Sequence, residues 1–244
     1  MSHLVMPKIE CVESSDVYGR FTAEPMEKGF GITLGNSLRR VLLGSLQGTA
    51  VTRVKIGGVQ HQFSIIPNVK EDVIQFLLNV RALRLRSFTE RPGEMTLEVV
   101  GKGRVCAADI KPSADFEIVN PELYLATLDS PEATLNVEFN VEQGIGWKQA
   151  SSGDGLPIGV IPVDAIFTPV RKVNYSIEPS HISYEAEYEK LVLDVWTDAT
   201  ISPAEALRQS AHILAEQFSC FTTFALAPER ETEVEPQILI PVGQ

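Results

Sequence analysis

Three glycines near the start of the chain are the first residues whose spacing could serve a chemical function. Gly29, Gly31 and Gly35 lead into an apolar stretch, and glycines at the start of a helix can cradle a phosphate. A dinucleotide-binding loop has the spacing G-x-G-x-x-G, and a P-loop ends in G-K followed by Ser or Thr. The sequence here is G-x-G-x-x-x-G with no lysine after it. We therefore expect these glycines to shape the entry into a helix and to let a neighbouring element approach closely.

Other residues with catalytic or metal-binding potential are scattered along the chain. The four histidines are dispersed, and the sequence contains neither H-E-x-x-H nor G-x-S-x-G. The acidic segment 13–16 (ESSD) is more typical of a loop than of a metal site. The pattern favours a protein without catalytic residues, cofactor or metal of its own, although an active site assembled from scattered residues stays open as an alternative.

Composition narrows the possible classes further. The 244 residues include three cysteines, an odd number at distant positions, which predicts neither a disulfide framework nor a zinc site. The formal net charge of −11 disfavours direct binding of a nucleic-acid backbone. The sequence shows no signal-peptide pattern and no apolar run near the ~20 residues of a membrane helix. We expect a soluble, cytoplasmic protein that binds neither DNA nor membrane directly.

Two segments of the first third of the chain have helical periodicity. Segment 68–80 is predicted to begin at Asn68, with Glu71 three residues later as a supporting acid. Segment 29–46 is followed by Gly48, a natural stop for a helix. Its apolar residues recur at the spacing of one helical face; they are Leu34, Leu38, Val41, Leu42 and Leu46.

Segment 202–225 near the other end of the chain predicts the longest helix. Ser202 is expected to cap it, with Pro203 at the first helical position and Glu205 completing a capping box. An unusually apolar helix face tends to mark a contact with another protein, and burial in a symmetric dimer would satisfy it. Coverage by the strands of the same chain is the alternative. The repeating apolar residues are Leu207, Ala211, Leu214, Phe218 and Phe221.

Most of the chain between these helices is strand-like. Apolar and polar residues alternate, and a Gly57–Gly58 turn is expected inside one of the stretches. With a helix near each end and strands in the middle, the layout predicts a domain formed by both chain ends and a second domain inserted between them. The predicted strands lie in 50–63, 95–100, 133–142, 171–179 and 190–197.

Two adjacent arginines interrupt the first apolar helix. Arg39 and Arg40 point about 100° apart on a helix, so they cannot both belong to the apolar stripe. Neither has an acid four residues earlier. They are either solvated side chains of the outer face or a pair that contacts a partner, where the planar guanidinium of arginine is favoured.

Long motifs resemble one protein family over nearly the whole chain. Segment 24–56 contains KGFGITLGNSLRRVLLGSL, and 61–83 contains HQFSIIPNVKEDVIQFLLNVRAL. Further matches follow in order at 107–110, 157–178, 189–218 and 236–242. These motifs resemble those of the bacterial RNA polymerase alpha subunit, in its amino-terminal part.

The resemblance implies a fold and a function. The fold would be α+β, with two main helices packed on a sheet in a discontinuous dimerisation domain and a mostly β domain inserted in it. The function would be that of a non-catalytic subunit of a nucleotidyltransferase complex. The subunit would homodimerise and serve as the platform for the beta and beta-prime subunits. The implied ranges are 1–49 and 172–230 for the dimerisation domain, 50–171 for the insert, and 231–244 for a flexible tail.

The resemblance also assigns residues to surfaces. Arg40, Arg39 and His61 would contact beta, and Arg81, Arg171 and Lys172 would contact beta-prime. The implied dimer interface comprises Phe30, Leu34, Leu38, Val41, Leu42, Leu46, Leu214, Phe218 and Phe221. Members of the family usually continue into a carboxy-terminal domain that contacts DNA. We expect that domain to be absent here, whether trimmed or naturally lost. Another homodimeric scaffold without catalysis is the alternative function.

Overall fold

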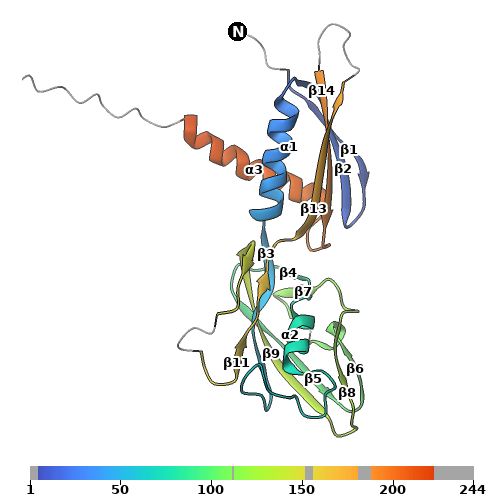
Figure 1. The fold of residues 1–244 in the computed structure, drawn as a ribbon, viewed down its shortest axis with the longest axis vertical. Coiled ribbons are helices and arrows are strands. Elements are labelled where there is room, and N and C mark those ends of the chain that lie inside the picture. The colour runs from blue at the N-terminus through green and yellow to red at the C-terminus, as the bar shows by residue number, and fades with distance from the viewer. Residues whose placement is uncertain (1–4, 112, 152–155, 181–187, 223–244) are drawn as a thin grey trace, which may run out of the picture.

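A computed structural model describes residues 5–111, 113–151, 156–180 and 188–222. Two groups of elements are distinguished below: the terminal unit, residues 5–46 and 170–222, and the inner unit, residues 47–169. Figure 1 shows the terminal unit above the inner unit, with the chain crossing between them near β3 and β13. Within these described residues, many antiparallel strands and three α-helices make the fold α+β, as predicted.

The terminal unit is built around one antiparallel sheet of four strands in the order β1-β2-β14-β13. The sheet joins the two ends of the chain, because Arg20 of β2 lies opposite Asp194 of β14. The strands are β1 (Lys8–Ser14), β2 (Tyr18–Glu27), β13 (Val170–Pro179) and β14 (Tyr188–Thr197). The last two confirm the strands predicted at 171–179 and 190–197, whereas β1 and β2 were not predicted.

Two helices cover one face of this sheet. Helix α1 (Phe30–Gly44) lies over β13, β14 and β2, and α3 (Pro203–Thr222) contacts α1, β14 and β2. The glycines of α1 permit this close packing: a Cβ at Gly35 would lie 2.7 Å from Tyr175 Cδ2. The predicted role of the glycines in close approach is therefore confirmed. The buried core between helices and sheet consists of Phe21, Leu42, Leu46, Val170, Val173, Leu193, Val195 and Ala206.

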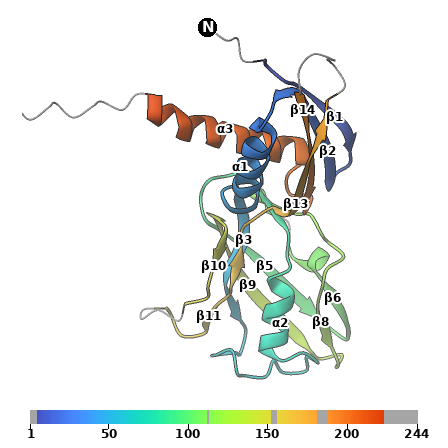
Figure 2. The same ribbon diagram turned by 45° about the horizontal axis from the view of Figure 1, so that its top comes forward.

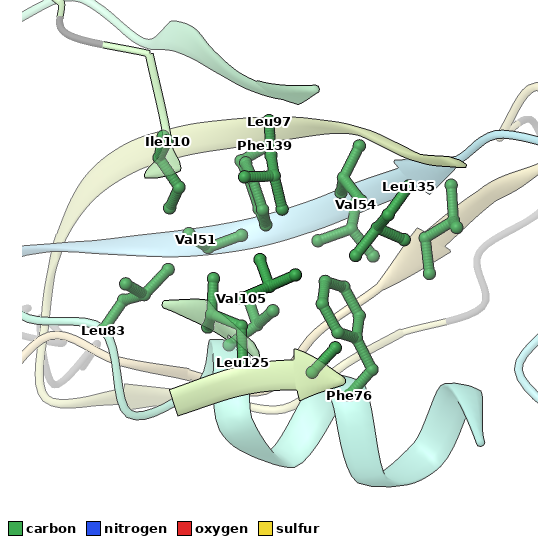
Figure 3. Packing of buried hydrophobic residues seen from close by; sticks show 14 of the residues in the cluster. Val51, Val54, Phe76, Leu83, Leu97, Val105, Ile110, Leu125, Leu135 and Phe139 are labelled. Atoms are coloured by element: carbon green, nitrogen blue, oxygen red, sulfur yellow. The ribbon is translucent and has the colours of Figure 1, made fainter. Parts of the chain in front are cut away.

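The inner unit surrounds a larger core between a sheet and α2. Its main sheet has the order β5-β9-β3-β4-β7, with β11 also paired to β3. Figure 3 shows Phe76 of α2 directed toward Val54 of β3 and Leu135 of β9, so that helix and sheet share one interior. The elements of this unit are β3 (Gln47–Ile56), α2 (Val73–Val80), β4 (Leu85–Ser87), β5 (Gly93–Val100), β6 (Gly103–Cys106), η1 (Ala107–Asp109), β7 (Phe116–Ile118), β8 (Tyr124–Leu128), β9 (Thr134–Ile145), β10 (Trp147–Lys148), β11 (Val160–Pro162) and β12 (Ala165–Ile166).

Strand β9, between β5 and β3, shows why one face of this sheet is buried. Leu135, Val137, Phe139 and Val141 are buried, and the residues between them are exposed or half-buried. A strand with one buried face is expected to show this period of two. The strands predicted at 95–100 and 133–142 are confirmed as β5 and β9.

Segment 50–63 was expected to form two strands around the Gly57–Gly58 turn, and that prediction is wrong. Strand β3 ends at Ile56, and the residues that follow form turns. The glycine pair does make a turn, since Val59 N donates to Ile56 O at 3.1 Å and Gly58 has a φ of +77°. The partners of β3, however, are β4, β9 and β11, all separated from it along the chain, so β3 forms no hairpin with the residues that follow the turn.

The boundaries of two predicted helices also need correction. Helix α1 ends at Gly44, so Leu46 lies beyond it. Helix α2 begins at Val73 rather than Asn68, and its cap is Asp72, whose carboxylate accepts the Gln75 N–H at 2.7 Å. Glu71 does not support a cap, because its carboxylate accepts instead the backbone N–H of Thr127 and the hydroxyl of Tyr124.

The predicted start of the third helix is confirmed. Ser202 Oγ accepts the N–H of Glu205 at 3.2 Å, as an N-cap side chain does. The carboxylate of Glu205 pairs with Arg208 at 2.7 Å and does not complete a capping box. The predicted end at residue 225 and the tail 231–244 lie outside the described residues.

Candidate protein-binding surface

Helix α1 presents part of its apolar surface to solvent. Phe30 is 44% exposed and Leu34 is 37% exposed, although both are large apolar side chains. Val41, two turns further along, is half-buried. At about 100° per residue these three side chains lie on one stripe of the helix. That stripe is free to meet another surface.

Two residues of the predicted dimer interface belong instead to the core of the chain itself. Leu42 is 0% exposed and Leu46 is 1% exposed, so a partner cannot reach them. Leu38 is half-buried and packs against the same core. The periodicity identified the apolar surface of the helix, but one side of that surface packs against the sheet and the other side is exposed to solvent. Leu42 and Leu46 therefore belong to the core of this chain and not to its exposed apolar surface.

Helix α3 carries the second exposed apolar stripe. Leu214 is half-buried, whereas Phe218 is 59% exposed and Phe221 is 73% exposed. Figures 1 and 2 both show α3 passing α1 and extending away from the sheet. The second half of α3 therefore has an apolar face that nothing in the described chain covers. We call Phe30, Leu34, Val41, Leu214, Phe218 and Phe221 together the α1–α3 surface.

Strand β1 adds apolar side chains that sequence reasoning missed. Ile9 pairs with Ala23 of β2, and Cys11 pairs with Phe21, whose side chain is in the core. Ile9 and Cys11 thus point to the face of the sheet that the helices cover. Both are exposed, because α1 and α3 reach β2 but do not extend over β1. The alternation of Ile9, Glu10 and Cys11 was the available signal.

The two arginines of α1 are both exposed. Among the described residues no carboxylate forms an ion pair with Arg39 or Arg40. Their guanidinium groups are therefore available to acceptors on another molecule.

The third residue assigned to the beta contact lies in the inner unit. His61 follows β3 in an exposed segment, and its Nδ1 lies 3.1 Å from Ser64 Oγ. Phe63 and Ile65 beside it are strongly exposed, as is Ile158. Residues 60–63 and 156–162 line an open groove of about 400 Å³. The apolar side chains here form a second surface, which sequence reasoning identified only through His61.

The basic residues assigned to the beta-prime contact lie in different units. Arg81 follows α2 in the inner unit, and its Nη1 lies 3.5 Å from Asp164 Oδ2. Arg171 and Lys172 are on β13 of the terminal unit. Arg171 pairs with Asp198 at 3.2 Å, and the ammonium of Lys172 lies 4.6 Å from the ring centre of Trp196. The structure gives each cation a partner and does not gather them into one cluster.

The shifted pKa values of three described residues arise from local pairs and burial. The hydrogen bond from Arg20 lowers the pKa of Asp194, and the hydrogen bond to Asp194 raises the pKa of Tyr18. Burial, followed by the hydrogen bond to Glu71, raises the pKa of Tyr124. These groups pair with one another in strands and turns, away from the grooves.

Metal-ligating clusters and membrane-spanning helices are both absent from the described parts of the chain. No group of three or more His, Cys, Asp or Glu residues there could hold a metal ion. Of the helices that are described, none is long and apolar enough to cross a membrane. The candidate site among the described residues is the exposed apolar α1–α3 surface of an α+β fold.

Comparison with known proteins identifies the family. Residues 54–168 match the family model described as the RNA polymerase Rpb3/RpoA insert domain. A protein of Dehalococcoides mccartyi is 55% identical over 91% of this chain and 68% of its own length. Proteins of Herpetosiphon aurantiacus and a Roseiflexus species are each 47% identical, over 96% and 97% of this chain and 71% and 72% of their own lengths. All three are named DNA-directed RNA polymerase subunit alpha. The chain belongs to the family of DNA-directed RNA polymerase alpha subunits.

Proposed function

We propose that this alpha subunit has no catalytic role of its own and acts as a dimeric platform for assembly of RNA polymerase. The observation that carries the proposal is the α1–α3 surface, with two phenylalanines of one helix more than half exposed. Apolar surface of this kind marks contacts between proteins. Two copies related by a twofold axis would bury the same surface on both sides.

We place dimerisation in the discontinuous domain expected at 1–49 and 172–230, with 50–171 as an insert. In the structure the corresponding boundaries fall at the terminal unit, 5–46 and 170–222, which includes Arg171. The pairing of β2 with β14 supports this division, because it unites both ends of the chain in one sheet. The match of 54–168 to a family model described as an insert domain supports it as well. The dimer interface consists of the six residues of the α1–α3 surface.

The two copies of a symmetric dimer then meet different partners. Arg40, with Arg39 and His61, contacts the beta subunit. Arg81, Arg171 and Lys172 contact beta-prime. Equivalent residues therefore have different roles in the two copies, and assembly removes the symmetry of the dimer.

Substitution Phe218→Asp tests the dimer. It would place a carboxylate in the apolar interface, which costs several kcal/mol when the charge has no partner. Phe88→Asp is the matched control, because Phe88 is an equally exposed phenylalanine of the inner unit. We expect sedimentation at micromolar concentration to show a dimer for the wild type and the control and a monomer for Phe218→Asp. A fully dimeric Phe218→Asp chain would refute the assigned interface.

Substitution Arg40→Ala tests the platform role. The side chain is exposed and outside the apolar stripe, so dimerisation should survive its loss. A pull-down of purified beta subunit by the wild-type chain, by Arg40→Ala and by the control Arg91→Ala measures binding. We expect the wild type and the control to retain beta and Arg40→Ala to lose most of it. Equal retention by all three would remove Arg40 from the interface, and no retention by the wild type would refute the platform role.

A further inference from the structure

Three successive backbone carbonyls of the β14–α3 turn accept hydrogen bonds from arginines of the inner unit. Arg84 Nη1 lies 3.5 Å from the carbonyl of Asp198. Arg86 Nη2 lies 2.9 Å from the carbonyl of Ala199, and Arg86 Nε lies 3.0 Å from that of Thr200. Both arginines come from the β4 region of the inner unit, and the turn belongs to the terminal unit.

The guanidinium of Arg86 is held from its other side as well. Its Nη1 donates to Glu117 Oε2 at 2.8 Å, and Glu117 lies opposite Arg86 in the pairing of β4 with β7. A planar guanidinium with three fixed acceptors has a defined orientation. Lysine offers one compact ammonium group and cannot donate to all three acceptors in this planar geometry. Arg86 therefore connects the sheet of the inner unit to the turn in a specific geometry.

The turn that receives these bonds is itself tightly fixed. The carboxylate of Asp198, only 7% exposed, accepts the Thr200 N–H at 3.0 Å and pairs with Arg171 at 3.2 Å. Asp198 N donates to Pro169 O at 3.0 Å. Ser202, the cap of α3, follows directly. A displacement of the turn would thus be transmitted to the start of α3.

Apolar packing does not fill the junction between the two units. A cavity of about 260 Å³ remains there, and residues of both units line it, among them Gln47, Arg86, Ile201 and Gln209. The two large cores are separate: one belongs to the terminal unit and the other to the inner unit. Directed polar contacts are therefore the main restraint on the relative orientation of the units, besides the two chain crossings.

We propose that Arg86 is a positioning residue that fixes the orientation of the inner unit relative to the start of α3. This goes beyond the proposed function and does not need it. If the proposed contacts with the large subunits hold, the hydrogen bonds between Arg86 and the turn have a further consequence. Arg40 lies on the terminal unit and His61 on the inner unit, so one fixed orientation presents both to a partner and reduces the ordering cost of binding.

Distance measurement between two spin labels tests the proposal. The labels are placed at Lys102→Cys in the inner unit and Asn174→Cys in the terminal unit, with Cys11, Cys106 and Cys220 replaced by serine. Labelled chain is mixed with an excess of unlabelled chain, so that a dimer contributes one pair of labels. We expect one narrow distance distribution for otherwise unchanged chain, and loss of that narrow distribution on Arg86→Ala.

Two further variants separate orientation from general stability. Arg91→Ala, in the connection between β4 and β5, removes an exposed arginine nearby and should keep the narrow distribution. Arg86→Lys keeps the positive charge beside Glu117 but loses the planar guanidinium, so it should also broaden the distance distribution. Circular dichroism establishes that each variant is folded.

The outcomes are distinct from those of the dimerisation test. A folded Arg86→Ala chain with an unchanged narrow distribution would overturn the proposal. A narrow distance distribution for Arg86→Lys, like that of the unchanged chain, would overturn the claim that the planar guanidinium is required. Sedimentation of the same samples measures dimerisation separately. The distance distribution can therefore be interpreted even if the chain does not form the proposed dimer.

Discussion

Asp194 illustrates how a single residue joins the two ends of the chain. Its carboxylate accepts hydrogen bonds from Arg20 Nε at 2.8 Å and from the hydroxyl of Tyr18 at 2.7 Å. Both donors are on β2, more than 170 positions earlier in the sequence. The residue types suggested nothing special at this position, because an ion pair across two strands depends on register. Sequence reasoning therefore had no means of finding it.

This pairing predicts an acid-dependent loss of stability. The folded pKa of Asp194 is lowered, chiefly by Arg20, so the pair stabilises the fold above the unfolded pKa of about 3.9. That contribution is lost as pH falls through the folded pKa. We expect Asp194→Asn to reduce the free energy of unfolding by ~1 kcal/mol at neutral pH, with a difference from wild type that shrinks in acid.

Denaturant unfolding at several pH values measures this difference. Asp129→Asn, at an exposed position, is the control and should match wild type throughout. A difference for Asp194→Asn that stayed constant into strong acid would argue against the ionised pair.

At the scale of elements, α1 shows what periodicity can and cannot predict. The repeat of apolar residues correctly predicted a helix, because helix formation depends largely on local spacing and on the signals that start and stop it. It could not assign Leu42 to the core and Phe30 to the surface. That distinction depends on where the sheet lies, and β2, one of its strands, was not predicted.

The packing of α1 on the sheet predicts the effect of a small substitution. In Gly35→Ala the new Cβ would lie 2.7 Å from Tyr175 Cδ2 and 3.0 Å from Leu191 Cδ1, so these side chains or the helix itself must shift. We expect a loss of about 1–3 kcal/mol in the free energy of unfolding, despite the better helix propensity of alanine.

Gly44→Ala is the matched control at the other end of the same helix. A Cβ there would meet no atom within 4 Å, so stability should be unchanged or slightly higher. Thermal or denaturant unfolding measures the change in stability of both variants relative to wild type. Equal stabilities would show that α1 can shift away from the sheet without cost.

At the scale of the whole molecule, the family resemblance predicted the α+β class, and the sequence layout predicted the concentration of strands in the middle. The long alternating strands were predictable because one face of each is buried. Their partners were not, because pairing depends on contacts between distant segments. The candidate interface shows the same division. Phe218 and Phe221 are apolar in the sequence and exposed in the structure, whereas the hydrogen bonds of Arg86 go to the two backbone carbonyls of Ala199 and Thr200, which carry no sequence signal.

The union of both chain ends in one sheet also determines the order in which the protein can fold during synthesis. Strand β2 ends at Glu27, but its partner β14 does not begin until Tyr188. The strands of the inner unit all lie between these positions and can pair as soon as they leave the ribosome. The β1–β2 hairpin must wait for them with one edge unpaired. Closure of the terminal sheet, and with it the seating of α1 and α3, is therefore the last step, and a chain that stops short of β14 retains an exposed strand edge.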